Sequence, residues 1–355
     1  MSRAVVEGAV HRVPAEEHRR LTTGVLERLG TPPAAAREQA DMLLEGDLRG
    51  HASHGLRRLD VLVGRVRAGL ITPDAQPELS WRMPSVLVVD GRGGLGPPTA
   101  HRAVDALLDR VGETGVAVAA IRGAGHLGML APYVERMAGR GVIGLATTTS
   151  EALVHPWGAA PAMLGTNPLA AAIPTGDEPI VLDMATGQIS RGKVLDHAAR
   201  GVALPEGAVV DAEGRPTTDA TAALDGAISP FGGPKGYALS LVLEALVATV
   251  TGTALGRDVR GTLDTTDPCT KGDVVIALDP AAFGAGDPAP LQAFLGELRG
   301  LPAAPGHAGV TVPGDRARAT RARNLAEGVP VDPGTWQRAR EIADEISGVR
   351  MVSFP

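Results

Sequence analysis

The chain has 355 residues, 44% of them hydrophobic, and a formal net charge of −6 from 34 basic and 40 acidic side chains. This length allows one large or two ordinary domains with real cores. The acidic balance and the lack of a basic stripe argue against nucleic acid and anionic membranes as partners. Cys269 is the only cysteine, which excludes an internal disulfide and a thiolate metal cluster and fits a reducing compartment.

Neither a targeting segment nor a membrane anchor is expected. The stretch from Met1 to Pro14 is polar and has no apolar core of the kind a signal peptide needs. The most apolar stretch, Tyr237 to Val250, is interrupted by Glu244 and is too short to cross a bilayer. We therefore expect a soluble cytoplasmic protein.

Apolar residues at helical spacing make the first 70 residues look all-helical. The pattern then alternates between short apolar strands and helices, which is typical of an α/β layer fold. The predicted helices are Pro14–Leu29, Pro33–Arg49, Gly55–Ala68, Thr99–Val111, Leu130–Arg140, Gly236–Thr251, Pro288–Leu298 and Pro333–Ile346. The predicted strands are Ser85–Asp90, Val116–Ile121, Val142–Thr148, Ile180–Asp183 and Val274–Leu278, and residues 151–234 are otherwise expected to be loop-rich.

Two glycine clusters match G-x-G-x-x-G, each between a strand and a helix: Gly91, Gly93 and Gly96, then Gly123, Gly125 and Gly128. Either could be a dinucleotide-binding turn. The strand after the first cluster ends in Arg122, however, where an acidic residue would contact a ribose hydroxyl. Glycine is also abundant, at 46 residues, so the alternative is a pair of tight turns.

Lysine is rare in this arginine-rich chain, with only Lys193, Lys235 and Lys271. A lysine that persists in such a composition can indicate a need for a compact ammonium group. Lys235 lies in GGPKGY before a predicted helix, where it could anchor a phosphate or carboxylate. The same scarcity favours a function for Lys193, whereas Lys271 has no motif around it and is expected in a solvated turn.

Two segments contain histidines of interest. His51 and His54 lie three residues apart but lack companions at metal-ligand spacing, so no metal site is predicted. His126 follows a strand within the second glycine cluster, where ligand-binding chemistry gathers in α/β folds; the alternative is a solvent-exposed turn histidine. Asp183 follows the strand IVLD and could be functional or could cap a helix.

Five segments of the chain are distinctive together: DLRGHASHGLRRL from Asp47, GHLG from Gly125, LGTNP from Leu164, VLDMATG from Val181 and GGPKGY from Gly232. They resemble the type-2 malate/L-lactate dehydrogenase family, which includes ureidoglycolate dehydrogenase, sulfolactate dehydrogenase and Δ1-piperideine-2-carboxylate reductase. The likeness runs in the same order from about Val13 to Trp336, nearly the whole chain.

The resemblance implies an α/β fold that binds NAD or NADP without a Rossmann domain, and a homodimer with active sites near the subunit interface. We expect a helical N-terminal segment (1–75) packed with the C-terminal helix region (315–355). An α/β region with the catalytic loop (76–150) and a cofactor-binding region (151–314) would lie between them.

The resemblance also implies roles for individual residues. His54 and His126 are the acid/base candidates, and Asp183 could orient a histidine. Arg58, with Ser53, would bind the substrate carboxylate, a task that suits a guanidinium fork. The residues expected to line the cofactor are Thr148, Ser150, Thr166, Asn167, Lys193 and Lys235.

The chain departs from the family pattern at several polar positions. Ala52 replaces an aspartate, Gly123 and Gly125 replace asparagines, Thr149 replaces an asparagine and Gly187 a serine. These changes predict a roomier or less polar pocket than malate needs. The leading hypothesis is reversible oxidation of a small 2-hydroxy acid to its 2-oxo acid. The alternatives are reduction of a cyclic 2-imino acid, which needs the same parts, and a nucleotide-binding protein that has lost catalysis.

Either histidine could exchange the proton, because the pKa of imidazole lies near neutrality. His54 stands one helical turn before Arg58, so both can face one ligand. His126 has glycines where the family has amides, and nothing adjacent in sequence is expected to orient its ring. We therefore predict His54 as the proton donor, with His126 positioning the substrate or the nicotinamide.

Overall fold

The computed structural model describes residues 11–284 and 286–348. Residues 1–10, where no signal peptide is expected, and the end of the predicted C-terminal region, 349–355, lie outside this description. The chain divides into two compact units. The first combines the residues up to Asp74 with those from Asp315 onward, and the second spans Ala75–Gly314.

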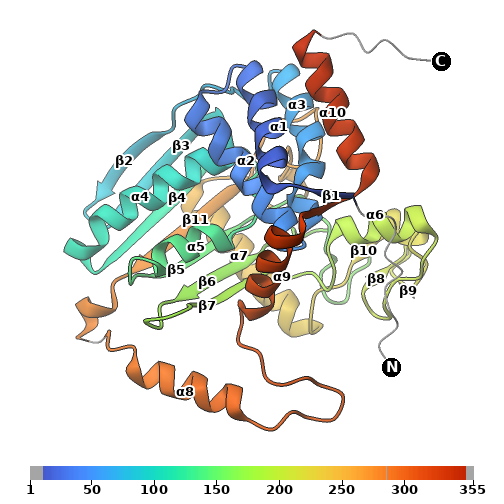
Figure 1. Ribbon diagram of the computed structural model, residues 1–355. Coiled ribbons are helices and arrows are strands. Elements are labelled where there is room, and N and C mark those ends of the chain that lie inside the picture. The colour runs from blue at the N-terminus through green and yellow to red at the C-terminus, as the bar shows by residue number, and fades with distance from the viewer. Residues whose placement is uncertain (1–10, 285, 349–355) are drawn as a thin grey trace, which may run out of the picture. The chain divides into compact units, whose positions relative to one another are not determined.

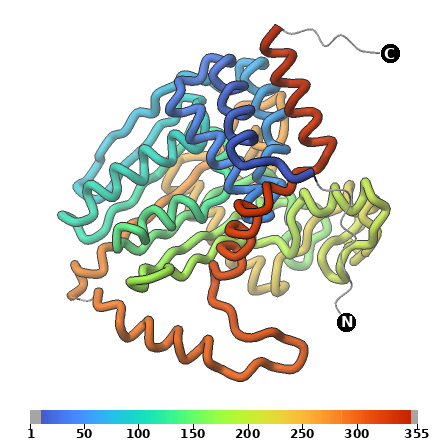
Figure 2. The backbone as a smooth tube through the Cα atoms, in the orientation of Figure 1, coloured from blue at the N-terminus to red at the C-terminus, as the bar shows by residue number. Residues whose placement is uncertain are grey.

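The first unit is built from helices of both chain ends. They are α1 (Ala15–Arg28), α2 (Pro33–Leu48), α3 (Leu59–Arg67), α9 (Asp315–Glu327) and α10 (Pro333–Ser347). The apolar faces of α1, α2, α3 and α10 share one core that includes Val25, Leu44, Leu56, Trp336 and Ile342, and α9 is tied to α2 by Asn324, whose Nδ2 donates to Leu48 O. Figures 1 and 2 show the blue N-terminal helices beside the red α10. The expected packing of N- and C-terminal segments is present in this unit.

The expectation of an all-helical start is wrong in two places. Strand β1 (His11–Val13) pairs antiparallel with β12 (Val329–Val331), more than 300 residues away in sequence. Three-residue strands are too short to show a two-residue period. The third helix begins at Leu59 instead of Gly55, because two 3₁₀ turns, Ala52–His54 and Leu56–Arg58, precede it.

The second unit is organised around a seven-stranded sheet in the order β2-β3-β4-β11-β5-β6-β7. The strands are β2 (Glu78–Met83), β3 (Val86–Gly94), β4 (Val116–Ala124), β5 (Ile143–Thr148), β6 (Leu169–Ile173), β7 (Ile180–Met184) and β11 (Gly272–Leu278). Among the described strands of this sheet, only β3 and β4 pair in parallel, and β11 lies antiparallel between β4 and β5. The predicted α/β class is confirmed, and the sheet is mixed.

Helices cover both faces of this sheet (Figure 1). One face carries α4 (Gly96–Thr114) and α5 (Ala131–Ala138), and a methyl group at Gly144 of β5 would meet α5. The other face carries α7 (Pro234–Thr251), and a methyl group at Gly272 of β11 would meet Thr251. Since side chains alternate along a strand, Asp273 faces the same side as α4 and α5.

The region expected to be loop-rich contains more regular structure than predicted. It includes β6, α6 (Arg191–Arg200) and a small sheet of β8 (Val209–Val210), β9 (Pro216–Thr217) and β10 (Ala227–Ile228). The same region holds the 3₁₀ turn Ala222–Leu224, and further along are the 3₁₀ turns Gly256–Asp258 and Pro280–Phe283 and the helix α8 (Ala289–Gly300). Within the described residues, no helix is both long and apolar enough to cross a membrane.

Candidate active site

The Ser53–Arg58 turn presents the residues predicted to handle the substrate in the first unit. His54 N–H donates to His51 O at 2.8 Å and Arg58 N–H to Gly55 O at 2.9 Å, which closes two successive 3₁₀ turns. The Arg58 Nε–H donates to Ser53 O at 3.0 Å. Leu56 and Leu59 anchor the segment in the core. The turn thus fixes the guanidinium of Arg58 against the backbone that carries His54.

The electrostatic environment of His54 holds its ring neutral. Burial, then the positive charge of Arg58, then that of His51 lower the pKa of His54 from its ordinary 6.5 to about 3. Burial disfavours the charged imidazolium, and a neighbouring cation repels it. At neutral pH the ring is therefore a proton acceptor, and any anion that neutralises Arg58 will raise its pKa.

The loop after β4 presents His126, whose ring is half-buried. Gly128 N–H donates to His126 Nδ1 at 3.0 Å. We expected no residue adjacent in sequence to orient this ring, and the residue that orients it is two positions on, through its backbone amide. A neutral imidazole that accepts at Nδ1 carries its proton on Nε2, so His126 can donate a hydrogen bond from Nε2.

The two G-x-G-x-x-G matches pack against each other. Gly125 N–H donates to Gly94 O at 2.9 Å. A methyl group at Gly96 would overlap the backbone oxygens of Gly125 and His126, and one at Gly91 would overlap Gly123 O. These glycines have a packing reason of their own, which supports the interpretation as paired tight turns at the end of the parallel strands.

Asp183, at the end of β7, contacts the same loop. Its Oδ2 accepts from Leu130 N–H at 3.0 Å and from Ala131 N–H at 2.8 Å. Leu130 is the N-cap residue of α5 and Ala131 is its first residue, so a carboxylate from β7 caps this helix. The structure thus brings Asp183 to the segment that carries His126, and an orienting role toward a histidine stays a prediction.

Hydroxyl groups cluster where β5 ends and β6 begins. Ser150 Oγ accepts from Thr166 N–H at 3.0 Å and lies 3.2 Å from Thr166 Oγ1. Thr148 Oγ1 donates to Gly272 O at 3.2 Å. The three hydroxyls predicted to line the cofactor thus come from adjacent segments of the second unit.

Asn167 lies inside a buried polar network instead of on the surface. Its side chain is fully buried, with Nδ2 donating to Glu244 Oε2 at 2.7 Å and to Ser240 Oγ at 3.1 Å. Its φ of +27° is a conformation that asparagine tolerates better than most residues. These bonds tie the Thr166–Asn167 segment to α7, and contact between Asn167 and the cofactor stays a prediction.

The start of α7 has the features of an anion site. Its first residue is Pro234, and its N-cap residue is Gly233, which has no side chain to cap the helix. The N–H groups of Lys235 and Gly236 belong to this first turn, and the Lys235 side chain is exposed beside them. Free helix amides and an ammonium group favour phosphate. With the nearby hydroxyls, this donor set fits a nicotinamide dinucleotide.

Lys193 lies in the first turn of α6 and its side chain is exposed. Val194 of α6 and Tyr237 of α7 belong to the same hydrophobic cluster. The segments with the two lysines predicted to bind cofactor therefore pack on a common core.

The expectation for Lys271 is wrong. Lys271 is 2% exposed and Asp273 is 1% exposed, and Lys271 Nζ lies 2.5 and 2.6 Å from the two Asp273 carboxylate oxygens. They flank Gly272 at the start of β11, whose carbonyl accepts from Thr148 Oγ1. Sequence reasoning missed this pair because K-G-D resembles a polar turn, and only the pairing of β11 between β4 and β5 buries it.

Two of the departures from the family pattern do not face open space. Thr149 is 1% exposed and its Oγ1 accepts from Gly272 N–H at 3.1 Å. A methyl group at Gly187 would lie 3.1 Å from Ile228 Cγ2. The prediction of a less polar pocket therefore depends on Ala52, Gly123 and Gly125.

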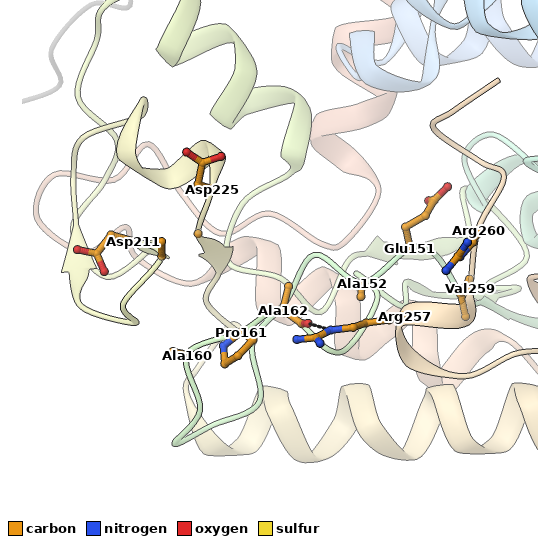
Figure 3. Close-up of a pocket in the computed structure, with 12 residues that line it drawn as sticks. Glu151, Ala152, Ala160, Pro161, Ala162, Asp211, Asp225, Arg257, Val259 and Arg260 are labelled. Atoms are coloured by element: carbon orange, nitrogen blue, oxygen red, sulfur yellow. Dashed lines mark hydrogen bonds between the residues drawn. The ribbon is translucent and has the colours of Figure 1, made fainter. Parts of the chain in front are cut away.

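A cavity of about 480 Å³ lies elsewhere in the second unit (Figure 3). Its charged lining residues are Glu151, Asp211, Asp225, Arg257 and Arg260. Much of this charge already has partners: Glu151 binds the backbone at Thr262 and Leu263, Asp211 binds Arg215, and Arg257 donates to Ala162 O. The cavity includes none of the predicted site residues. Among the described residues, no group of three His, Cys, Asp or Glu is placed to hold a metal ion.

Comparison with known proteins gives the class. The malate/L-lactate dehydrogenase family model matches residues 13–340. A malate/(S)-sulfolactate dehydrogenase of Methanothermus fervidus is 34% identical, over 94% of this chain and 98% of its own. A Δ1-pyrroline-2-carboxylate reductase of Pseudomonas fluorescens is 38% identical, over 90% and 95%. A crystal structure of a dehydrogenase from Sinorhizobium meliloti superimposes with a TM-score of 0.91 at 45% identity, covering 94% of this chain and 98% of the other.

The chain therefore belongs to the malate/L-lactate dehydrogenase family, as its motifs indicated. It is an oxidoreductase that uses NAD or NADP. The alternative of a binding protein without catalysis is set aside.

Proposed function

We propose that this enzyme interconverts a small 2-hydroxy acid and its 2-oxo acid, with a carboxylic acid as its small-molecule partner. The observation that carries this is the Ser53–Arg58 turn, which holds a guanidinium and a neutral imidazole together. Arg58, with Ser53, would bind the carboxylate, and His54 would exchange a proton with the oxygen at the 2-position. His126, through Nε2–H, would position the substrate or the nicotinamide.

The coupling between Arg58 and His54 gives a direction to proton transfer. In the free protein, Arg58 lowers the pKa of His54. A substrate carboxylate bound to Arg58 neutralises that charge, so binding raises the pKa of His54 and lets the ring hold a proton. Burial, the largest cause of the low pKa, remains, and it is the neutralised charge of Arg58 that favours His54 as a proton donor for 2-oxo acid reduction when the acid is bound.

The bound cofactor supplies the hydride chemistry. For its binding we propose Lys235 with the first amides of α7, Lys193, and the polar groups of Thr148, Ser150, Thr166 and Asn167. The sheet supports a binding mode without a Rossmann domain. Its described strands contain one parallel pair, whereas a Rossmann sheet is mostly parallel. On this proposal, 76–150 contains the catalytic loop and 151–314 the cofactor-binding region.

A second candidate function is reduction of a cyclic 2-imino acid. The 38% identity to a Δ1-pyrroline-2-carboxylate reductase favours it, and so do the glycines at 123 and 125, which leave the His126 loop with fewer polar groups. The test is a panel of 2-oxo acids and cyclic imino acids assayed with NADH and NADPH. Turnover of 2-oxo acids supports the proposal, whereas turnover of imino acids alone replaces it with the second candidate.

Replacing Lys235 with alanine is expected to weaken cofactor binding by about 1.5–3 kcal/mol, the range for a hydrogen bond to a charged group. This corresponds to about 10- to 150-fold in Kd. Titration of NAD(P)H by fluorescence measures it. Arg200→Ala, which removes an exposed cation of α6, is the control and should leave Kd unchanged. An unchanged Kd for Lys235→Ala would refute the assignment.

We also propose that the enzyme is a homodimer and that α7 contributes to its interface. One face of α7 packs on the sheet, and the residues exposed on the other, past the first turn with its exposed Lys235, are Ala238, Leu241, Val242, Ala245, Leu246, Thr249 and Val250. This part of the face exposes no charge, because Glu244 points inward to Asn167. Exposed apolar strips of this kind mark protein interfaces, and an uncharged strip can pair with its own copy around a two-fold axis.

Val242→Glu is expected to convert the dimer into monomers, because Val242 is 63% exposed and a buried carboxylate at an interface has no partner. Light scattering at micromolar concentration measures the mass. Met83→Glu, at an equally exposed residue of β2, is the matched control and should stay dimeric. A monomeric wild-type protein, or a dimeric Val242→Glu variant, would contradict the proposal.

For the setting of the enzyme we propose the cytoplasm, with neither nucleic acid nor membrane as partner. The net charge of −6 and the single cysteine support this.

A further inference from the structure

Two buried residues that belong to no predicted site lie directly beneath the Ser53–Arg58 turn. His18 of α1 is 0% exposed and Asp47 of α2 is 4% exposed. His18 Nε2 lies 3.0 Å from Asp47 Oδ2. We propose that Asp47, supported by His18, is a positioning residue that sets the geometry of the Ser53–Arg58 turn. The proposal rests on the proposed function of that turn.

The contacts of Asp47 are aimed at the middle of the turn. Its Oδ2 accepts from Leu56 N–H at 2.7 Å. A methyl group at Gly55 would overlap the Asp47 carboxylate, so the carboxylate lies directly against the Gly55 backbone. His54 and Arg58 stand on either side of this Gly55–Leu56 segment. Any shift of the carboxylate therefore changes the separation and direction of the two side chains proposed to hold the substrate.

Gly46, which precedes Asp47 in α2, also contacts the Ser53–Arg58 turn. His51 N–H donates to Gly46 O at 2.7 Å. A methyl group at Gly46 would overlap the carbonyl of His54. Gly46 thus packs against the His54–Gly55 peptide, and Asp47 accepts from the amide of the next peptide unit, so Asp47 is the α2 side chain that holds the backbone path of the turn.

His18 completes the coordination of the carboxylate. Its Nδ1 is buried and has no hydrogen-bond partner among the described residues. The ring is therefore best matched by the tautomer with the proton on Nε2, which donates to Asp47 Oδ2. Asp47 thus receives two donors at Oδ2, one from α1 and one from the turn. Thr22 Oγ1–H donates to His18 O at 2.9 Å, which ties the histidine back into α1.

A carboxylate at position 47 is better explained by positioning of the Ser53–Arg58 turn than by stability of the fold alone. A buried carboxylate loses its hydration, and well-packed apolar residues often stabilise a site equally well. What a carboxylate provides is directed acceptor geometry toward one backbone amide. At an active site, misplacement of a reacting group by about 1 Å can cost about 10²-fold in rate, so a fixed acceptor at this position has a functional consequence.

The test compares Asp47→Asn with Glu45→Gln. Glu45 is on the same helix and binds Arg49 and Arg321, so its variant disturbs α2 without contacting the turn. Asp47→Asn is expected to lower kcat/KM for the 2-oxo acid by about 10- to 100-fold, with unchanged cofactor Kd. Glu45→Gln should lower the melting temperature and leave kcat and KM near wild type. Wild-type kinetics in Asp47→Asn would overturn the proposal.

Hydrogen–deuterium exchange gives a readout that needs no turnover. Faster exchange of the peptide that covers residues 52–58 is expected in Asp47→Asn and not in Glu45→Gln. His18→Leu removes the donor to Asp47 and should exchange as fast as Asp47→Asn. His18→Gln keeps an N–H donor and should exchange at the wild-type rate. Unchanged exchange in Asp47→Asn and His18→Leu overturns the positioning role. Absence of turnover by the wild type on the whole substrate panel would instead refute the proposed function.

Discussion

His54→Ala is expected to lower kcat by about 10²–10⁴, the usual contribution of a general acid or base. The ring stands beside the proposed carboxylate ligand Arg58 and is kept neutral in the free protein. His126→Ala is expected to act mainly on KM, because the Gly128 amide occupies His126 Nδ1 as an acceptor and leaves Nε2 to bind the substrate or the nicotinamide. Steady-state kinetics of both variants separate the two roles.

The pH dependence follows from the direction of the pKa shift. Oxidation of a 2-hydroxy acid requires neutral His54, and reduction of the 2-oxo acid requires the protonated ring. In the free protein the pKa is about 3, and bound carboxylate raises it. The pH profile of kcat reports the enzyme–substrate complex, and that of kcat/KM reports the free enzyme. For oxidation, activity should therefore fall on the acidic side at a higher pH in the kcat profile than in the kcat/KM profile. Both limbs should vanish in His54→Ala.

His51 provides the control for this assignment. It is exposed and contributes to lowering the pKa of His54. His51→Ala should move the acidic limb of the kcat/KM profile for oxidation to higher pH, while the value of kcat stays within a few-fold of wild type. If His126→Ala abolishes kcat with the fold intact and His54→Ala mainly raises KM, the two roles are reversed.

The sequence predicts the long amphipathic helices and most central strands because their periodicity is local. It does not predict that β11 enters between β4 and β5, because β11 lies more than 120 residues after both. The shortest elements, such as β1 and β12, have too few residues to show a period. Local periodicity therefore does not predict strand pairing between segments that are far apart in sequence.

In the predicted site, too, local features are visible in the sequence and long-range contacts are not. The motif residues Ser53, His54 and Arg58 lie in one turn, since six consecutive residues hold them. The support of that turn by His18 and Asp47 depends on α1 and α2 packing together. The Gly128 amide on His126 depends on the loop path. Side-chain identity is visible in sequence, and the partner that orients each side chain is not.

Lys271→Met is expected to destabilise the protein by about 3–5 kcal/mol, the cost of leaving one partner of a buried ion pair without its counter-charge. The remaining Asp273 carboxylate is 1% exposed, so water cannot solvate it. Denaturant unfolding at fixed protein concentration measures the loss. Arg260→Met breaks an exposed pair with Asp267 and should cost less than about 1 kcal/mol.

The double variant Lys271→Met/Asp273→Leu decides whether unpaired charge is the cause. It removes both charges and should recover most of the stability, because apolar replacements of a buried pair are often neutral or stabilising. An equal loss in the single and double variants would show that packing, not charge, is responsible. The pair flanks Gly272, which bonds Thr148 and Thr149. If the pair also fixes this strand end for the cofactor, the double variant will be stable and yet bind NAD(P)H more weakly than wild type.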